Sequence, residues 1–234
     1  MFQLRKANQR GHSQIDWLDS YHTFSFSDYY DPGHMGWGPL RVINDDTVAP
    51  GAGFPTHSHR DMEIISYVLE GELQHKDTLG TGSVIRPGDV QLMEAGTGIA
   101  HSEFNASTIS PVHFLQIWII PDRAGIAPSY QQTHFADAEK QDNFRLIVSP
   151  DGANGSLRIQ QDVRLYSALL NSERTLNWQL DSARKAYIHV ARGSVVINGI
   201  GLQAGDGVRI CEEAELAFAN AQTADILLFD LPDQ

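Results

Sequence analysis

Short apolar runs separated by glycine and proline turns extend along the whole chain, and segments with helical periodicity are scarce. Residues 61–76 alternate loosely between apolar and polar side chains, and the glycines of residues 79–84 supply a turn before the next run. The apolar stretch at residues 112–121 ends at a proline and closes this first series. The pattern predicts an all-β fold, in which many short antiparallel strands form a sandwich or barrel.

A second series of apolar runs follows residues 122–155, which are predicted to form a loop with a short helix at 135–143. The two series share an order, because YVLEGELQH resembles YIHVARGSVVI and IRPGDVQLM resembles LQAGDGVRI. An internal duplication explains this order and predicts two domains in tandem, residues 1–130 and 131–234. The second copy carries only His189 and no His-x-His pair, so we expect the first domain alone to hold a metal.

The balance of charges excludes several classes of partner. The 234 residues include 17 Lys and Arg against 29 Asp and Glu, a net charge of −12, whereas a broad phosphate-binding surface needs clustered cations. The single cysteine, Cys211, rules out an internal disulfide. The opening MFQLRKANQRGH has no apolar signal-peptide core, and no apolar run approaches the roughly 18 residues of a membrane span. We expect a cytoplasmic protein that contacts neither membrane nor nucleic acid directly.

Two pairs of candidate metal ligands occur at strand spacing. In a strand, residues i and i+2 point to one face, so His57 and His59 share a face, as do His101 and Glu103. Together they would give three neutral imidazoles and one carboxylate, a set that suits Fe(II), Mn(II), Ni(II), Cu(II) or Zn(II). Glu63 follows His59 by four residues on the same predicted strand face, so the pattern leaves open whether Glu63 or Glu103 is the carboxylate ligand.

The remaining histidines and the aromatic residues are weaker candidates. Four histidines are expected at the surface or in packing, and two others rank slightly higher as residues of a cavity mouth: His12, His34, His113 and His134, and then His22 and His75. Several large apolar side chains are assigned to the core, with the walls of a flat aromatic ligand site as the alternative: Phe24, Phe26, Tyr29, Tyr30, Met35, Trp37 and Phe54.

The chain resembles the cupins, and among them the pirin family of bicupins. Gly51, His57, His59 and Glu63 match the first cupin motif, whereas the second cupin motif is matched only loosely. The differences from the general cupin motifs are themselves typical of pirins. The stretches similar to pirins lie in the first 120 residues: HTFSFSDYYDP at 22–32, GPLRVINDD at 38–46, HSHRDMEI at 57–64, YVLEGELQH at 67–75 and GIAHSE at 98–103.

The resemblance implies a bicupin of two antiparallel β-barrel or jelly-roll domains, the second of them degenerate and without metal. It implies that His57, His59, His101 and Glu103 are the metal ligands, which leaves Glu63 behind them to orient a ligand or Arg60. It also implies one divalent transition-metal ion, Fe(II) first, with Mn, Ni, Cu, Co and Zn as alternatives.

The activity implied by the resemblance is that of a quercetin 2,3-dioxygenase, which opens the central ring of a flavonol with O₂ and releases carbon monoxide. Glu103 would then be the catalytic base. The alternative is a non-enzymatic, metal- or redox-regulated binding protein, a transcription cofactor like the pirins of animals, with a protein partner in place of a substrate.

Overall fold

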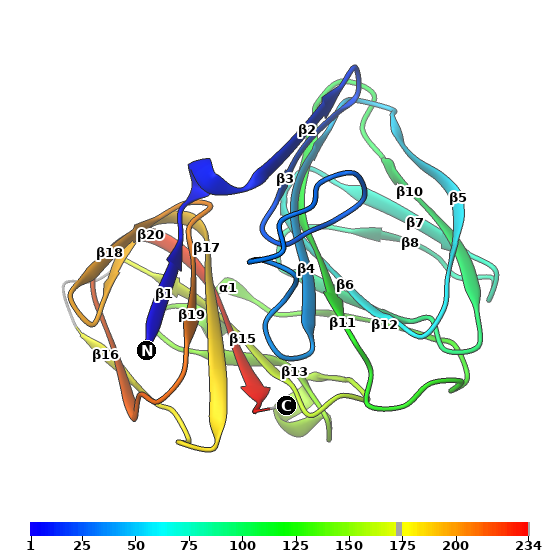
Figure 1. Cartoon of the computed structure of the whole chain (residues 1–234). Coiled ribbons are helices and arrows are strands. Elements are labelled where there is room, and N and C mark those ends of the chain that lie inside the picture. The colour runs from blue at the N-terminus through cyan, green and yellow to red at the C-terminus, as the bar shows by residue number, and fades with distance from the viewer. Residues whose placement is uncertain (172–174, 234) are drawn as a thin grey trace. The chain divides into compact units, whose positions relative to one another are not determined.

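The computed structural model describes residues 1–171 and 175–233 of the chain. It consists of β-strands with two 3₁₀ turns, Ala7–Gln9 and Ala153–Gly155, and one short helix, α1 (Asp137–Lys140) (Figure 1). Among the strand pairs of the described residues, only β13 with β14 is parallel, and the others are antiparallel. The all-β prediction is confirmed. No helix in the described part of the chain is long and apolar enough to cross a lipid bilayer.

The chain divides into two compact units. The N-terminal unit comprises Gly11–His134 with Ile159–Gln161, and the C-terminal unit comprises Met1–Arg10, Phe135–Arg158 and Asp162–Gln234. Residues 1–10, which the sequence analysis places in the N-terminal domain, therefore group with the C-terminal unit. The reason is strand pairing, because β1 (Phe2–Arg5) lies antiparallel to β19 (Gly207–Ile210).

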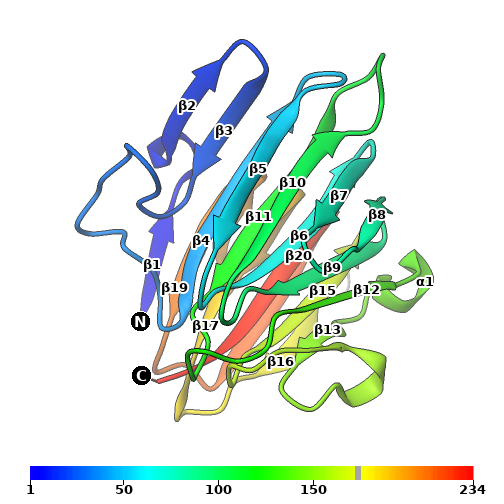
Figure 2. The same ribbon diagram turned by 90° about the vertical axis from the view of Figure 1, so that its right-hand side faces the viewer.

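Two sheets build the N-terminal unit. A seven-stranded sheet has the order β12-β9-β6-β11-β4-β3-β2, and a four-stranded sheet has the order β5-β10-β7-β8; Figure 2 shows the last four strands side by side. The strands of the larger sheet are β2 (Gly11–Ile15), β3 (Leu18–His22), β4 (Leu40–Val48), β6 (Glu63–Glu70), β9 (Asp89–Glu94), β11 (Val112–Ile119) and β12 (Ser129–His134). Those of the smaller sheet are β5 (Gly53–His59), β7 (Leu73–Asp77), β8 (Gly82–Ile85) and β10 (Ile99–Asn105).

The strands of the N-terminal unit show how the apolar pattern produces this arrangement. In β10, every second side chain from Ile99 to Asn105 is buried, as expected for a strand with one face turned inward. The central strand β6 is buried along almost its whole length, because it lies between β9 and β11 in the middle of the larger sheet. Buried apolar residues such as Val68, Leu73 and Phe114 form a core between strands of both sheets.

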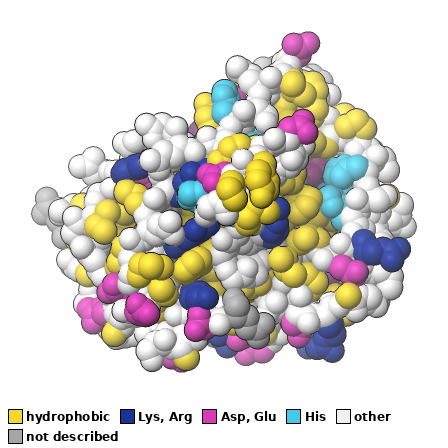
Figure 3. Space-filling model, viewed as in Figure 1, with side chains coloured by type: hydrophobic (Ala, Val, Ile, Leu, Met, Phe, Trp, Pro, Cys, Tyr) yellow, Lys and Arg dark blue, Asp and Glu magenta, His cyan; other side chains and the backbone are white. Residues whose placement is uncertain are grey.

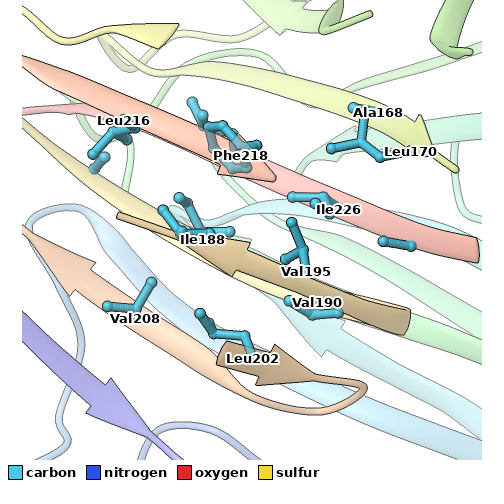
Figure 4. Close-up of a cluster of buried hydrophobic side chains, with 14 of the residues drawn as sticks. Ala168, Leu170, Ile188, Val190, Val195, Leu202, Val208, Leu216, Phe218 and Ile226 are labelled. Atoms are coloured by element: carbon cyan, nitrogen blue, oxygen red, sulfur yellow. The ribbon is translucent and has the colours of Figure 1, made fainter. Parts of the chain in front are cut away.

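A nine-stranded sheet makes up most of the C-terminal unit. Its path is β1-β19-β17-β20-β15-β13-β14, with β16 paired to β20 and β18 to β17. Alternate residues of β17 and β20, including Ile188, Val190, Phe218 and Ile226, pack into one apolar core (Figure 4). Its other strands are β13 (Arg145–Ser149), β14 (Leu157–Arg158), β15 (Arg164–Leu170), β16 (Leu176–Gln179), β17 (Arg184–Ile197), β18 (Ile200–Gln203) and β20 (Glu215–Pro232).

The stretch 122–155 is more ordered than the loop predicted for it. It contains β12 and β13, while α1 occupies only four residues of the predicted helical region. The strand β12 has the sequence SYQQTH, and it pairs along its whole length with β9 at the edge of the larger sheet. Because its side chains are polar, periodicity gives no signal for a strand, and the backbone pairing with β9 decides the structure instead.

Candidate metal centre

The strands β5 and β10 bring three histidines together. They are antiparallel neighbours in which His101 is the direct partner of His57 and Ile99 that of His59. The imidazole ring centroids of the three histidines are 4.5 to 4.9 Å apart, and one ligand nitrogen from each lies within 4.8 Å of the others. His101 is buried and the other two are partly exposed. In Figure 3, histidine side chains gather at the surface over the side of the molecule that carries the four-stranded sheet.

Hydrogen bonds orient the two rings that face each other. His57 Nδ1 donates to the carbonyl oxygen of Pro55 at 2.8 Å, which places its remaining lone pair on Nε2. His101 Nε2 lies 3.1 Å from that atom, and His101 Nδ1 lies 3.4 Å from Nδ1 of His75. If both rings are neutral, with their protons on Nδ1, two nitrogen lone pairs point at each other across 3.1 Å. A cation between them removes this repulsion.

A carboxylate fixes the tautomer of His101 through His75. His75 Nε2 lies 2.9 Å from Asp77 Oδ2, an acceptor, so His75 carries its proton on Nε2 and offers Nδ1 as an acceptor to His101. The other oxygen of Asp77 accepts backbone N–H groups of Leu79 and Thr81, at 2.9 and 3.0 Å, which hold the carboxylate in place. The sequence analysis ranked His75 slightly above other histidines as a candidate for a cavity mouth, and the structure buries it fully behind His101. The His-x-Asp spacing of residues 75 and 77 is the sequence signal that could have revealed this role.

Burial keeps these imidazoles neutral. Desolvation, together with the neighbouring histidines, lowers the pKa of His59 to about 4 and that of His101 to about 2. Desolvation also lowers the pKa of His75, against the opposing effect of Asp77. Metal binding requires deprotonated ligands, so the set is ready to coordinate a cation at neutral pH. Three convergent imidazole nitrogens fit a divalent transition metal.

Asp77→Asn is expected to weaken metal binding about tenfold, because the carboxylate that holds His75, and through it His101, is replaced by a neutral amide. The measurement is a competition titration of the purified protein with a chelator of known affinity. Asp89→Asn is the matched control, since Asp89 pairs with His134, an exposed histidine that is not one of the three. Equal metal affinity in the two variants would show that the Asp77 and His75 pair does not support the centre.

Glu103 lies on the same strand as His101, and its carboxylate is hydrogen-bonded to the larger sheet. The β5–β10 register shifts between these two residues. The Glu103 oxygens accept hydrogen bonds from Ser66 Oγ at 3.3 Å and Gln116 Nε2 at 2.7 Å, both on strands of the seven-stranded sheet. Glu103 therefore stands outside the group of mutually close ligand atoms, and its role as fourth ligand stays a prediction. Burial raises its pKa to about 7, so it exchanges a proton near neutral pH.

Glu63 does not continue the strand of the two histidines. The strand β5 ends at His59, Asp61 adopts a left-handed φ of 48°, and β6 begins at Glu63 in the other sheet. The expectation that Glu63 shares a strand face with the histidines is therefore wrong. Its carboxylate accepts backbone N–H groups of Gln160 and Gln161, at 2.7 and 3.3 Å, from the returning segment of this unit.

Glu63 is expected to make the stability of the protein fall between about pH 4.5 and pH 8. Burial raises the pKa of Glu63 to about 8, so the folded state holds a proton that the unfolded state has already lost in this range. Glu63→Gln cannot ionise, and its unfolding free energy should fall less with pH, by on the order of 2 kcal/mol. Denaturant unfolding at pH 5 and pH 9 measures the difference. The control is Glu70→Gln, exposed at the other end of β6, and it should keep the slope of the unchanged protein.

One cavity of about 430 Å³ opens beside the histidines. Its wall combines apolar side chains with buried polar ones from β3 and β4. Of the aromatic residues considered from the sequence, Phe26 and Phe54 line the cavity, together with Trp118, which packs edge-on against Phe26 and His59. The lining residues are Ser13, Leu18, Ser20, His22, Phe26, Ser27, Asn44, Asp46, Phe54, Pro55, His57, His59, Gln116 and Trp118.

Four histidines lie in other surroundings, each against an aspartate. The pairs are His12 with Asp19, His34 with Asp31, His113 with Asp45, and His134 with Asp89, at 2.6 to 2.9 Å. By contrast, His22 lies in the cavity wall.

Comparison with known proteins identifies similar chains of the same length. The Pirin family model matches residues 3–119, and a model described as the quercetinase C-terminal cupin domain matches residues 146–231. A protein of Escherichia coli K12 named quercetin 2,3-dioxygenase is 46% identical over 233 residues, 99% of each chain. A pirin-like protein of Caulobacter vibrioides is 39% identical, covering 98% of this chain and 99% of its own. The crystal structure of the Escherichia coli bacterial pirin YhhW in complex with nickel(II) superimposes with a TM-score of 0.94 at 46% identity, covering 99% of both chains.

Proposed function

We propose that this chain, which belongs to the pirin family, is a metal-dependent dioxygenase that opens the central ring of a flavonol with O₂ and releases carbon monoxide. The observation that carries the proposal is the group of three convergent imidazoles, two of which line a cavity with aromatic walls. A relative over the full length is named quercetin 2,3-dioxygenase, which supports this reaction class.

We propose that His57, His59 and His101 hold a single divalent ion, with Glu103 as the fourth ligand. Fe(II) is our first choice, and Mn, Ni, Cu, Co and Zn are the alternatives, since a nitrogen-rich set accepts several first-row metals. The nickel(II) complex of the Escherichia coli pirin supports a divalent ion at such a site. When bound, the ion supplies Lewis acidity, which lowers the pKa of an enolic hydroxyl of the substrate.

Glu103 is the group we propose as the proton acceptor. Its carboxylate is buried, and hydrogen bonds from Ser66 and Gln116 hold it in place. A base works best when its pKa lies near the operating pH, and burial brings Glu103 to about 7. Ionised Glu103 takes the proton of the flavonol 3-hydroxyl, and the substrate anion that results is the electron-rich species that reacts with O₂.

The cavity walls would orient the flat substrate. Phe26 and Trp118 meet at a ring-centroid distance of 5.3 Å in an edge-on arrangement, and Phe54 adds a further aromatic face. Such walls exclude water from the reacting carbon atoms and favour planar aromatic ligands. The C-terminal domain, residues 131–234, is proposed to be a degenerate cupin without a metal, since its copy of the strand pattern carries His189 alone.

The test is an assay of metal-loaded protein for quercetin loss, oxygen uptake and carbon monoxide release. His57→Ala/His59→Ala is the blank, because it removes two of the three imidazoles, and His134→Ala is the control for histidine loss at a distance. We expect turnover in the unchanged protein and in the control only. Full metal occupancy without turnover of any flavonol would contradict the dioxygenase proposal.

The alternative is a metal- or redox-regulated binding protein. It is favoured by the partial exposure of His57 and His59, because the charge of an ion held there would be felt at the protein surface. A stoichiometric protein partner whose affinity depends on the metal, found together with absent turnover, would establish this alternative.

A further inference from the structure

The cavity has a polar patch on the sheet opposite the strands of the three histidines. Ser20 and His22 of β3 are the direct cross-strand partners of Asp46 and Asn44 of β4. Residues two apart in a strand share a face, so the four side chains form a compact square, here called the polar patch. All four are at most 3% exposed, and all four line the same cavity as His57 and His59.

Hydrogen bonds within the polar patch use the amide oxygen of Asn44 and one carboxyl oxygen of Asp46. Ser20 Oγ donates to Asp46 Oδ1, and His22 Nδ1 donates to Asn44 Oδ1 at 2.8 Å. Ser13 Oγ lies 3.0 Å from His22 Nε2, so both ring nitrogens of His22 have a hydrogen-bond partner. Among the described residues, the hydrogen bonds of Asn44 and Asp46 use the amide oxygen and one carboxyl oxygen, and both residues line the cavity. The amide nitrogen of Asn44 and the second carboxyl oxygen of Asp46 are then a donor group and an acceptor on the cavity wall, and they match a hydroxyl group, which both donates and accepts.

The charge of the cavity excludes anionic ligand groups at this place. Among the described residues, no lysine or arginine lines the cavity, and Asp46 is its one acidic lining residue. A carboxylate or phosphate at the polar patch would lose its water shell and meet Asp46 with no basic side chain beside it. Burial also raises the pKa of Asp46 to about 7, which shows how poorly this wall tolerates negative charge. A neutral hydroxyl is the group that fits.

We propose that the polar patch is a subsite for a phenolic hydroxyl on the part of the substrate remote from its metal-binding oxygens. The inference rests on the proposed function and adds selectivity to it. Flavonols with hydroxyls on their outer rings are preferred over a flavonol whose outer rings are bare. The polar patch thus distinguishes flavonols by the hydroxyl groups on their outer rings, while the histidines bind the ring that is opened through the metal.

The test compares two ligands with the same metal-binding group and different outer rings. Kaempferol carries hydroxyls on both outer rings, and 3-hydroxyflavone carries none. Binding to metal-loaded protein is measured without oxygen, so that no turnover occurs. The unchanged protein should bind kaempferol at least about tenfold more tightly, as expected for one or two buried hydrogen bonds. In Asp46→Leu the preference should fall to about threefold or less, with the affinity for 3-hydroxyflavone retained.

The matched control is Asp45→Leu, on the neighbouring residue of the same strand. Asp45 pairs with His113 on the other face, so the tenfold preference should persist. Ser20→Ala, which removes the hydroxyl that orients Asp46, is a milder variant for the case that Asp46→Leu does not fold, and it should reduce the preference about threefold. Equal affinity for both flavonols in the unchanged protein, or a preference that persists in the folded patch variants, would overturn the subsite alone. Failure to bind either flavonol would overturn the proposed function and the subsite together.

Discussion

His101→Ala is expected to weaken metal binding by more than about 100-fold and to reduce flavonol turnover to background. His101 is the buried member of the three histidines, and its Nε2 faces His57 at 3.1 Å. Its ring also links the centre to His75 and Asp77. His75, the nearest other imidazole, is held behind His101 by its bond to Asp77 and does not take the place of the missing ring. Elemental analysis after dialysis against a weak chelator measures the retained metal.

His134→Ala is the control for this experiment. It removes the same side chain from the same unit, but from an exposed position beside Asp89. It should retain metal and activity. If His101→Ala kept full metal occupancy, the assignment of the three histidines as ligands would be wrong, whatever happened to turnover.

Glu103→Gln is expected to retain much of the metal while lowering turnover by about 10²- to 10⁴-fold. The amide keeps the shape of the side chain and an acceptor for Gln116, and the three imidazoles remain, but the group can no longer take a proton. Glu63→Gln should reduce turnover far less, because Glu63 binds the backbone of Gln160 and Gln161. The measurement is kcat/KM beside metal content for both variants.

The pH profile gives a second check on Glu103. Because burial raises its pKa, Glu103 is protonated in acid, and kcat/KM should rise with pH and then level off. In Glu103→Gln this rise should disappear. If Glu63→Gln lost more turnover than Glu103→Gln, Glu63 would be the proton acceptor instead of Glu103. If Glu103→Gln lost as much metal as His101→Ala, Glu103 would be an essential ligand instead of a base.

The sequence carried enough information for the fold class and for the proximity of two histidines. Apolar runs broken by glycine turns have few solutions other than stacked antiparallel sheets, and residues two apart in a strand must share a face. His57 and His59 could therefore be paired by spacing. Their meeting with His101 depends on the pairing of β5 with β10, which connects segments far apart in the chain and has no local signal.

Features set by tertiary contacts could not be read from spacing. The strand β5 ends at His59 and Asp61 follows with a left-handed φ, so the alternation of strand faces does not continue from His59 to Glu63. The partners of Glu63 lie almost a hundred residues downstream. The polar segment β12 forms a strand because its backbone pairs with that of β9. The pattern of its side chains gives no sign of this pairing. For His75 the local His-x-Asp pattern was present, but only burial shows that it faces His101.

The division of the chain into two units affects how the protein can fold while it is being translated. The N-terminal unit needs the backbone of Ile159–Gln161 to satisfy the buried Glu63, so it cannot finish folding when the ribosome has made His134. The strand β1 precedes its partner β19 by most of the described chain. Chains that fold during translation usually complete their first domain early. Here each unit includes residues that lie far downstream of its first segment. A fragment of residues 1–130 would lack Ile159–Gln161 of the N-terminal unit, and a fragment of residues 131–234 would lack Met1–Arg10 of the C-terminal unit.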